Sequence, residues 1–138
     1  MYYKIVNQLE YIIFIFKLKT PLSRSMISKS VWQTHKLADK IAKDILNKRL
    51  YYTNNRRQAV IVLLIGSLGT GKTEFTKGLA RALHIKAKIL SPTFLIMRKY
   101  NHFYHLDCYR LLPRPEETLK ALAVDEVVNN SQNIVVIE

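Results

Sequence analysis

The sequence has one cysteine, few acidic residues and no long apolar run. Its single cysteine, Cys108, excludes a disulfide framework and a multi-cysteine zinc site, and it fits a reducing cytoplasm. The apolar run at residues 11–16 is far shorter than the roughly 20 residues of a transmembrane helix, so we expect no contact with a membrane. Repeats and low-complexity segments are also absent. A chain of 138 residues, 49% apolar and 23% charged, instead has the size and balance of one globular domain.

The shortage of acidic residues makes the chain strongly basic. Ten Asp and Glu residues stand against 22 Lys and Arg residues, for a net charge of +12. The excess is uneven, because residues 1–58 carry 12 basic and 3 acidic side chains, and residues 59–138 carry 10 and 7. Such an excess is typical of a nucleic-acid-binding patch or of an ordinary solvated surface, and the sequence leaves both open.

The first 25 residues differ in character from the rest. Their apolar run is closed by Lys17 and Lys19, and no small-residue cleavage site follows, which argues against a signal peptide. We interpret residues 1–25 as an N-terminal extension, either an added edge strand or a segment outside a native protein that starts at Met26. Residues 26–138 are then the predicted domain.

Periodicity predicts alternating helices and strands in that domain. Ser30 and Gln33 form a capping-box pair before a helix that runs to about residue 46, and Trp32 is expected to pack on that helix rather than to stack on a base. Residues 48–58 are predicted to be a loop. Residues 59–65 are apolar without alternation, which is typical of a strand buried on both faces of a parallel sheet. A second helix is expected from residue 72.

Later segments complete an α/β pattern. Residues 94–99 and 102–107 are predicted to be two short strands joined by a turn, and strand alternation places His105 and Asp107 on one face. Pro115 is expected to open a helix with acidic residues in its first turn. Residues 134–137 form a last buried strand, which Glu138 follows.

A phosphate-binding motif lies between the strand at 59–65 and the helix at 72. The residues Gly66-Ser67-Leu68-Gly69-Thr70-Gly71-Lys72-Thr73 match the pattern G-x-x-x-x-G-K-[ST]. Glycine lets backbone N–H groups surround phosphate oxygens, and the following helix directs its positive end to the same place. We expect Lys72 to bind the β- and γ-phosphates of a nucleotide, and the Thr73 hydroxyl to bind Mg²⁺.

Two acidic residues follow apolar strands and are candidates to hold that metal or to orient a water molecule. They are Asp107 and Glu138, and their spacing does not decide which acid does which. His105, beside Asp107, is expected to pack or to form a hydrogen bond rather than to act in catalysis.

Four linked motifs resemble the bacterial TsaE (YjeE) family over residues 26–138. They are the phosphate-binding loop, Ser91-Pro92-Thr93-Phe94, His105-Leu106-Asp107-Cys108-Tyr109-Arg110, and Ile137-Glu138. The resemblance implies a three-layer P-loop NTPase fold with a mainly parallel sheet and an antiparallel strand pair. It also implies a cytoplasmic ATPase that uses ATP and Mg²⁺ in threonylcarbamoyladenosine modification of tRNA. The expected partner is the TsaB–TsaD complex, through which tRNA is reached indirectly.

The resemblance assigns roles to individual residues. It makes Asp107 the Walker-B-like metal ligand and Glu138 a metal-binding or water-orienting acid. Ser91 and Thr93 fall in a switch-like segment near the γ-phosphate. A further role carried over is nucleotide binding for Thr34. The sequence itself leaves Arg110 open as a residue that supports Asp107, that contacts a phosphate or a partner, or that forms a surface salt bridge.

This sequence departs from the family pattern at three positions. The family usually has Asp at the position of Ser67 and Ala at that of Thr70, and it has Trp after Glu138, where this sequence ends. We therefore expect the domain to be incomplete at its C-terminus. Two other classes stay open: a small P-loop kinase of a nucleoside or metabolite, and a basic nucleic-acid-binding module without enzymatic activity.

Overall fold

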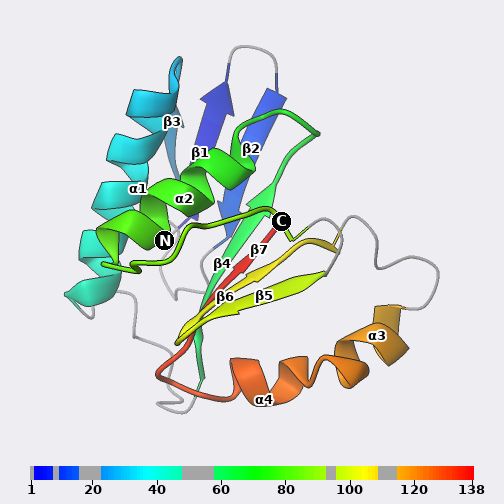
Figure 1. Cartoon of the computed structure of the whole chain (residues 1–138). Coiled ribbons are helices and arrows are strands. Elements are labelled where there is room, and N and C mark those ends of the chain that lie inside the picture. The colour runs from blue at the N-terminus through cyan, green and yellow to red at the C-terminus, as the bar shows by residue number, and fades with distance from the viewer. Residues whose placement is uncertain (1, 8–9, 16–22, 48–57, 93–95, 109–114) are drawn as a thin grey trace.

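The computed structural model describes residues 2–7, 10–15, 23–47, 58–92, 96–108 and 115–138. One sheet with helices on both faces makes up these residues (Figure 1). The helices are α1 (Val31–Leu46), α2 (Lys72–Ala82), α3 (Pro115–Ala121) and α4 (Val124–Val128). The strands are β1 (Tyr2–Asn7), β2 (Glu10–Ile15), β3 (Ser23–Ile27), β4 (Val60–Ile65), β5 (Met97–Tyr100), β6 (Phe103–Leu106) and β7 (Ile134–Ile137).

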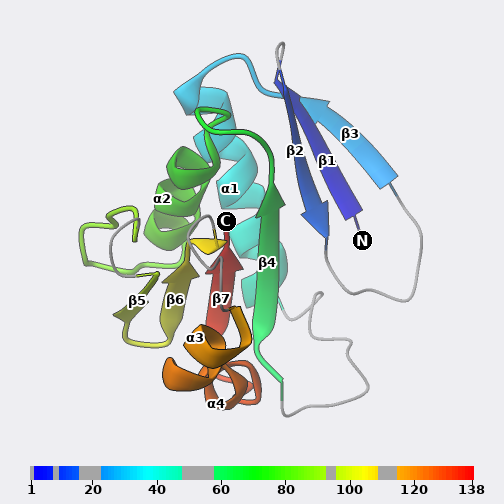
Figure 2. The same cartoon turned by 90° about the vertical axis from the view of Figure 1, so that its right-hand side faces the viewer.

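The sheet has the strand order β3-β1-β2-β4-β7-β6-β5. Its central strands β4, β7 and β6 are parallel, and β5 pairs with β6 in antiparallel fashion. The predicted α/β class, with parallel strands and an antiparallel pair, is thereby confirmed. The N-terminal residues extend the sheet, since β2 runs antiparallel to both β1 and β4, and β1 lies between β2 and β3 (Figure 2). Strand β3 crosses the predicted boundary between residues 25 and 26.

Two apolar clusters hold the helices against opposite faces of the sheet. On one face, α1 and α2 bury side chains such as Ile41 and Phe75 against Val62 and Val136. On the other face, Val127 of α4 packs with residues of β6 and β7. The alternation predicted for residues 103–107 is confirmed where the clusters show it, because Phe103 belongs to the first cluster and Tyr104 and Leu106 to the second. The three-layer arrangement follows from these two clusters.

The first two helices form as their sequence predicts. Ser30 caps α1 by accepting a hydrogen bond from the backbone N–H of Gln33 at 3.2 Å, while the Gln33 side chain accepts one from the backbone of Lys29 at 2.6 Å. Helices α1 and α2 lie close together at Gly78, where an added Cβ would lie 2.9 Å from His35 Cδ2 and 3.0 Å from Ala38 Cβ. Glycine at this position lets the two helices pack side by side.

Two predictions about burial are wrong. Strand β4 is buried on one face only, because the cluster that contains Val127 of α4 reaches this part of the chain only at Ala59, and Ile61 and Ile65 stay 39% and 42% exposed. Trp32 does not pack into the α1–α2 interface but is 63% exposed, because it lies away from the apolar stripe of α1. Residues 48–57 of the predicted loop lie outside the described residues. Residues 94–95 of the strand predicted at 94–99 also lie outside them.

Candidate nucleotide-binding site

The glycine-rich loop joins the end of β4 to the start of α2. Gly69 and Gly71 have positive φ angles of 84° and 94°, a backbone conformation that disfavours residues with a Cβ. The Thr70 hydroxyl donates a hydrogen bond to the Ser67 carbonyl at 3.0 Å and so holds the turn. Gly71 caps α2 without a side-chain hydrogen bond, so the first N–H groups of the helix face the loop uncapped by any side chain. This arrangement is suited to an anion such as phosphate.

The Lys72 side chain folds back over this loop. Its ammonium group donates hydrogen bonds to the carbonyls of Gly66 and Ser67, each at 2.7 Å. The positive charge of Lys72 is therefore already at the loop.

Glu138 follows β7, the strand next to β4, and its carboxylate receives three hydrogen bonds. The hydroxyl of Thr73 donates to Oε2 at 2.9 Å, while Thr76 Oγ1 and His105 Nε2 lie 2.7 and 2.8 Å from Oε1. Only 6% of the Glu138 side chain is exposed, and His105 is fully buried. The site thus ties the phosphate-binding helix to the end of a neighbouring strand.

These contacts set the charge of Glu138. Burial alone raises the pKa of this carboxyl, but the hydrogen bond and charge of His105, with the hydrogen bonds from Thr76 and Thr73, outweigh it. The net effect lowers the pKa below its ordinary value of 4.5. Glu138 is therefore an ionised acceptor near neutral pH.

Asp107 lies at the same edge of the sheet as Glu138. The backbone N–H of Cys108 donates to the Glu138 carbonyl at 2.7 Å, and that of Glu138 donates to Leu106 at 2.9 Å. Because β6 and β7 are parallel and paired, their carboxyl ends bring both acids to one edge. Burial and the charge of the neighbouring Asp107 raise the pKa of the Cys108 thiol.

A cavity of about 630 Å³ opens at this edge. It is lined by the loop, the start of α2, both acids and one residue that precedes β5. These residues are Gly66, Ser67, Leu68, Gly69, Gly71, Lys72, Thr73, Glu74, Ser91, Asp107 and Glu138.

The structure brings most of the predicted site residues together, with a few exceptions. Thr34 is not among the residues lining the cavity; it is buried in α1, where its hydroxyl is 2.7 Å from Ser28 Oγ and donates to the Ser30 carbonyl at 3.2 Å. Thr70 braces the loop without lining the cavity. Thr93 and Arg110 lie outside the described residues.

The sequence reasoning missed Thr76 as a partner of Glu138. Its spacing of three residues from Thr73 was an available signal, since positions i and i+3 share one face of a helix. His105 was predicted to form a hydrogen bond, and this is confirmed, although its partner was not foreseen.

The donor chemistry of the cavity fits Mg²⁺. Thr73, Asp107 and Glu138 offer hard oxygen atoms, and Thr73 keeps oxygen lone pairs while it donates its proton to Glu138. Within the described ranges, no cluster of three or more His, Cys, Asp or Glu side chains could hold a metal by itself.

A glycine-rich loop between a parallel strand and a helix, with acids after two neighbouring strands, defines an α/β protein of the P-loop NTPase fold. Comparison with known proteins specifies the family. The model of the family described as "Threonylcarbamoyl adenosine biosynthesis protein TsaE" matches residues 28–138, and the chain belongs to this TsaE family.

Curated relatives agree with this assignment. Each is a "tRNA threonylcarbamoyladenosine biosynthesis protein TsaE". The protein of Nostoc is 36% identical over 106 residues, which cover 74% of this chain and 64% of the relative. The protein of Bacillus subtilis is 43% identical over 70 residues, which cover 48% of this chain and 42% of the relative. The protein of Synechocystis is 51% identical over 55 residues, which cover 37% of this chain and 35% of the relative. The chain thus spans about one third to two thirds of the length of these relatives.

Proposed function

We propose that this chain binds and hydrolyses ATP with Mg²⁺ as part of the machinery that makes threonylcarbamoyladenosine in tRNA. The observation that carries this proposal is the hydrogen bond from Thr73 to Glu138, beside a glycine-rich loop that holds Lys72. It connects the last residue of the phosphate-binding motif to an ionised acid. The pathway in this proposal, biosynthesis of threonylcarbamoyladenosine in tRNA, is taken from the names of the relatives.

In this proposal the loop and Lys72 bind the phosphates. Backbone N–H groups of the loop and of the first turn of α2 donate to phosphate oxygens, and Lys72 turns from its two carbonyl acceptors to the β- and γ-phosphates. When bound, Mg²⁺ neutralises charge on the phosphates. Glu138 keeps the Thr73 hydroxyl in one orientation, with its proton toward the carboxylate and its lone pairs available to the cation.

Asp107 is the second carboxylate of the site. It lines the same cavity from the end of β6, one strand farther from the loop than Glu138. We assign Asp107 to the water molecules around the cation and to the orientation of the attacking water. Ser91 lines the cavity ahead of β5 and is the described residue of the proposed switch-like segment.

The proposed partner is the TsaB–TsaD complex, and the proposed location is the cytoplasm. In this scheme TsaD transfers the threonylcarbamoyl group to tRNA, and ATP turnover on this chain resets the complex. None of the helices in the described part of the chain is long and apolar enough to cross a membrane.

The proposal is tested by comparing Lys72→Ala and Asp107→Ala with a control, Lys77→Ala. Lys77 is exposed on the same helix and pairs with Glu74 at 2.6 Å, outside the phosphate-binding motif. Loss of the charge-assisted bonds of Lys72 should weaken ATP binding about 10- to 100-fold in calorimetry. Asp107→Ala should bind ATP and lose Mg²⁺-dependent phosphate release. Lys77→Ala should behave as wild type in both assays.

ATP affinity that is unchanged in Lys72→Ala would exclude this site. The assay is run with and without TsaB–TsaD, and it measures inorganic phosphate. If the assay yields a phosphorylated nucleoside or metabolite and no inorganic phosphate, the chain belongs to the kinase class.

A further inference from the structure

Opposite faces of the sheet carry opposite charge. Residues 27–47 and 72–90, which include α1 and α2, contain nine Lys and Arg residues and three acids. Residues 115–130, which include α3 and α4, contain four acids and one Lys. Because the two helix pairs pack on different sides of the sheet, the positive charge is concentrated on one side. The net charge of the whole chain conceals this asymmetry.

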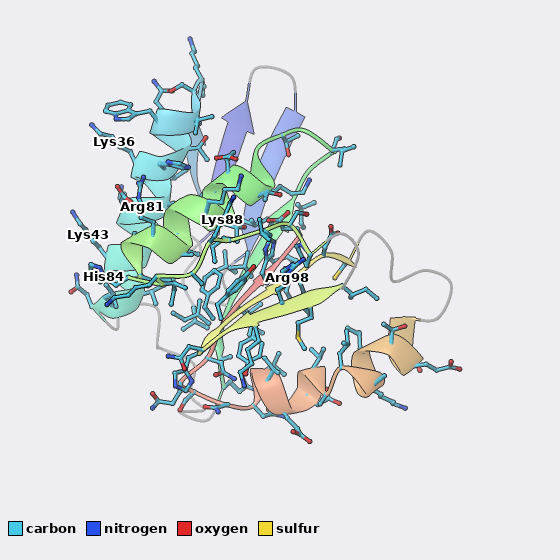
Figure 3. The ribbon with its side chains drawn as sticks, viewed as in Figure 1. Lys36, Lys43, Arg81, His84, Lys88 and Arg98 are labelled. Atoms are coloured by element: carbon cyan, nitrogen blue, oxygen red, sulfur yellow. The ribbon has the colours of Figure 1, made fainter. Side chains whose placement is uncertain are left out.

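The charge on the α1–α2 side is arranged in a row. Lys36, Lys40 and Lys43 follow one another at spacings of four and three residues, so they share one face of α1. All three are exposed, and Figure 3 shows Lys36 and Lys43 projecting away from the sheet, with Arg81 and His84 on the same side of the molecule. We call Lys36, Lys40, Lys43 and Trp32 the basic face.

The row of lysines is not neutralised by nearby acids. Among the described residues, Asp39 pairs with Arg81 at 3.4 Å and Glu74 pairs with Lys77 at 2.6 Å. No described carboxylate forms an ion pair with the three lysines of the basic face. Their charge is therefore available to an external anion.

Trp32 lies on the same face, one turn before Lys36. The residue is 63% exposed, and the Lys36 ammonium lies 3.9 Å from the centroid of its ring. A large aromatic side chain left in water beside a row of lysines matches the surfaces that bind unpaired nucleotides, where the ring stacks on a base and the lysines contact phosphates. The helix rises by eleven residue steps from Trp32 to Lys43, about 16 Å, which is enough for a few nucleotides.

We propose that the basic face binds RNA directly, with an unpaired base on Trp32 and the phosphate backbone along the three lysines. An acidic protein would satisfy the lysines, but it gives no reason for the exposed ring among them. The basic face shares no residue with the cavity of the phosphate-binding loop. The proposal therefore goes beyond ATP turnover and stands or falls separately from it.

Trp32 provides the measurement, because it is the single tryptophan of the chain. The full chain is titrated with an unmodified tRNA transcript, without ATP, while its tryptophan fluorescence is recorded. Stacking should quench the emission, and the affinity should fall with salt. In Lys36→Gln/Lys43→Gln, loss of two phosphate contacts should lower the magnitude of the log–log salt slope by about 1.4 and weaken binding about 25-fold at 0.1 M salt.

The matched control is Lys99→Gln/Lys120→Gln, which removes the same charge from exposed positions on β5 and α3. It should bind tRNA within about twofold of wild type. Equal weakening in both double variants would overturn the proposal, because net charge alone would then account for binding. So would tRNA binding without a change in Trp32 emission, or equally tight binding of a poly-glutamate peptide, which would assign the basic face to an acidic protein.

Discussion

Replacing Glu138 with Gln tests the central contact of the site. The carboxylate is a partner in three hydrogen bonds, with Thr73, Thr76 and His105, and is almost fully buried. In Glu138→Gln an amide oxygen at the position of Oε1 still accepts hydrogen bonds from Thr76 and His105, but without the negative charge. The amide N–H₂ group then faces the Thr73 hydroxyl, which must turn its proton away. A hydrogen bond to a charged group contributes about 1.5–3 kcal/mol, so we expect the free energy of unfolding to fall by about 2 kcal/mol near pH 7.

The dependence on pH gives a second readout of the same network. The pKa of Glu138 is lowered by folding, so its stabilising contribution is complete above the unfolded value of about 4.5 and is lost as the pH falls through the folded value. Gln does not titrate. The difference between wild type and Glu138→Gln should therefore be constant near neutral pH and should shrink below about pH 4.5.

Urea unfolding followed by circular dichroism, at about pH 7 and about pH 3.5, measures both effects. Glu126→Gln is the control, because Glu126 is exposed on α4, and it should change stability by no more than about 0.5 kcal/mol. A difference for Glu138→Gln that is equally small, or that is the same at both pH values, would refute the proposed network.

Two further predictions concern packing and thiol chemistry. Gly78→Ala gains helix propensity of about 1 kcal/mol but forces α1 and α2 apart at His35 and Ala38, so we expect a net loss of about 1 kcal/mol in urea unfolding. The loss should be smaller in a His35→Ala background, and an equal loss in both backgrounds would contradict the contact. Asp107→Asn should speed alkylation of Cys108 by iodoacetamide near pH 8, because burial and, after it, the Asp107 charge raise the pKa of the thiol, and the substitution removes the second of these causes. An unchanged rate would show that this charge does not reach Cys108.

Local patterns predicted the parts of the fold that local interactions determine. The capping pair of Ser30 and Gln33 marked the start of α1, and the phosphate-binding motif marked the turn between β4 and α2. Asp107 and Glu138 were found because acids after apolar strands reach the carboxyl edge of a parallel sheet. These features depend on residues near one another in sequence.

Features that depend on distant residues were harder to predict. The hydrogen bond of Thr76 with Glu138 joins residues 62 apart, and that of His105 with Glu138 joins residues 33 apart. The pairing of β2 with β4 likewise has no local signature. Trp32 was expected to pack on α1, but its position lies off the apolar stripe of that helix and leaves it exposed.

In the proposed function, the position of the Lys72 ammonium makes phosphate binding an exchange of hydrogen-bond partners. Two loop carbonyls already solvate this cation, so an incoming anion must displace them, and only the difference between the old and new bonds contributes to affinity. Orthophosphate has a single phosphate group, which must both accept the hydrogen bonds of Lys72 in place of the two carbonyls and accept those of the N–H groups of the loop. A polyphosphate can do the two tasks with different phosphates. We therefore expect the site to bind longer phosphate chains in preference to small anions.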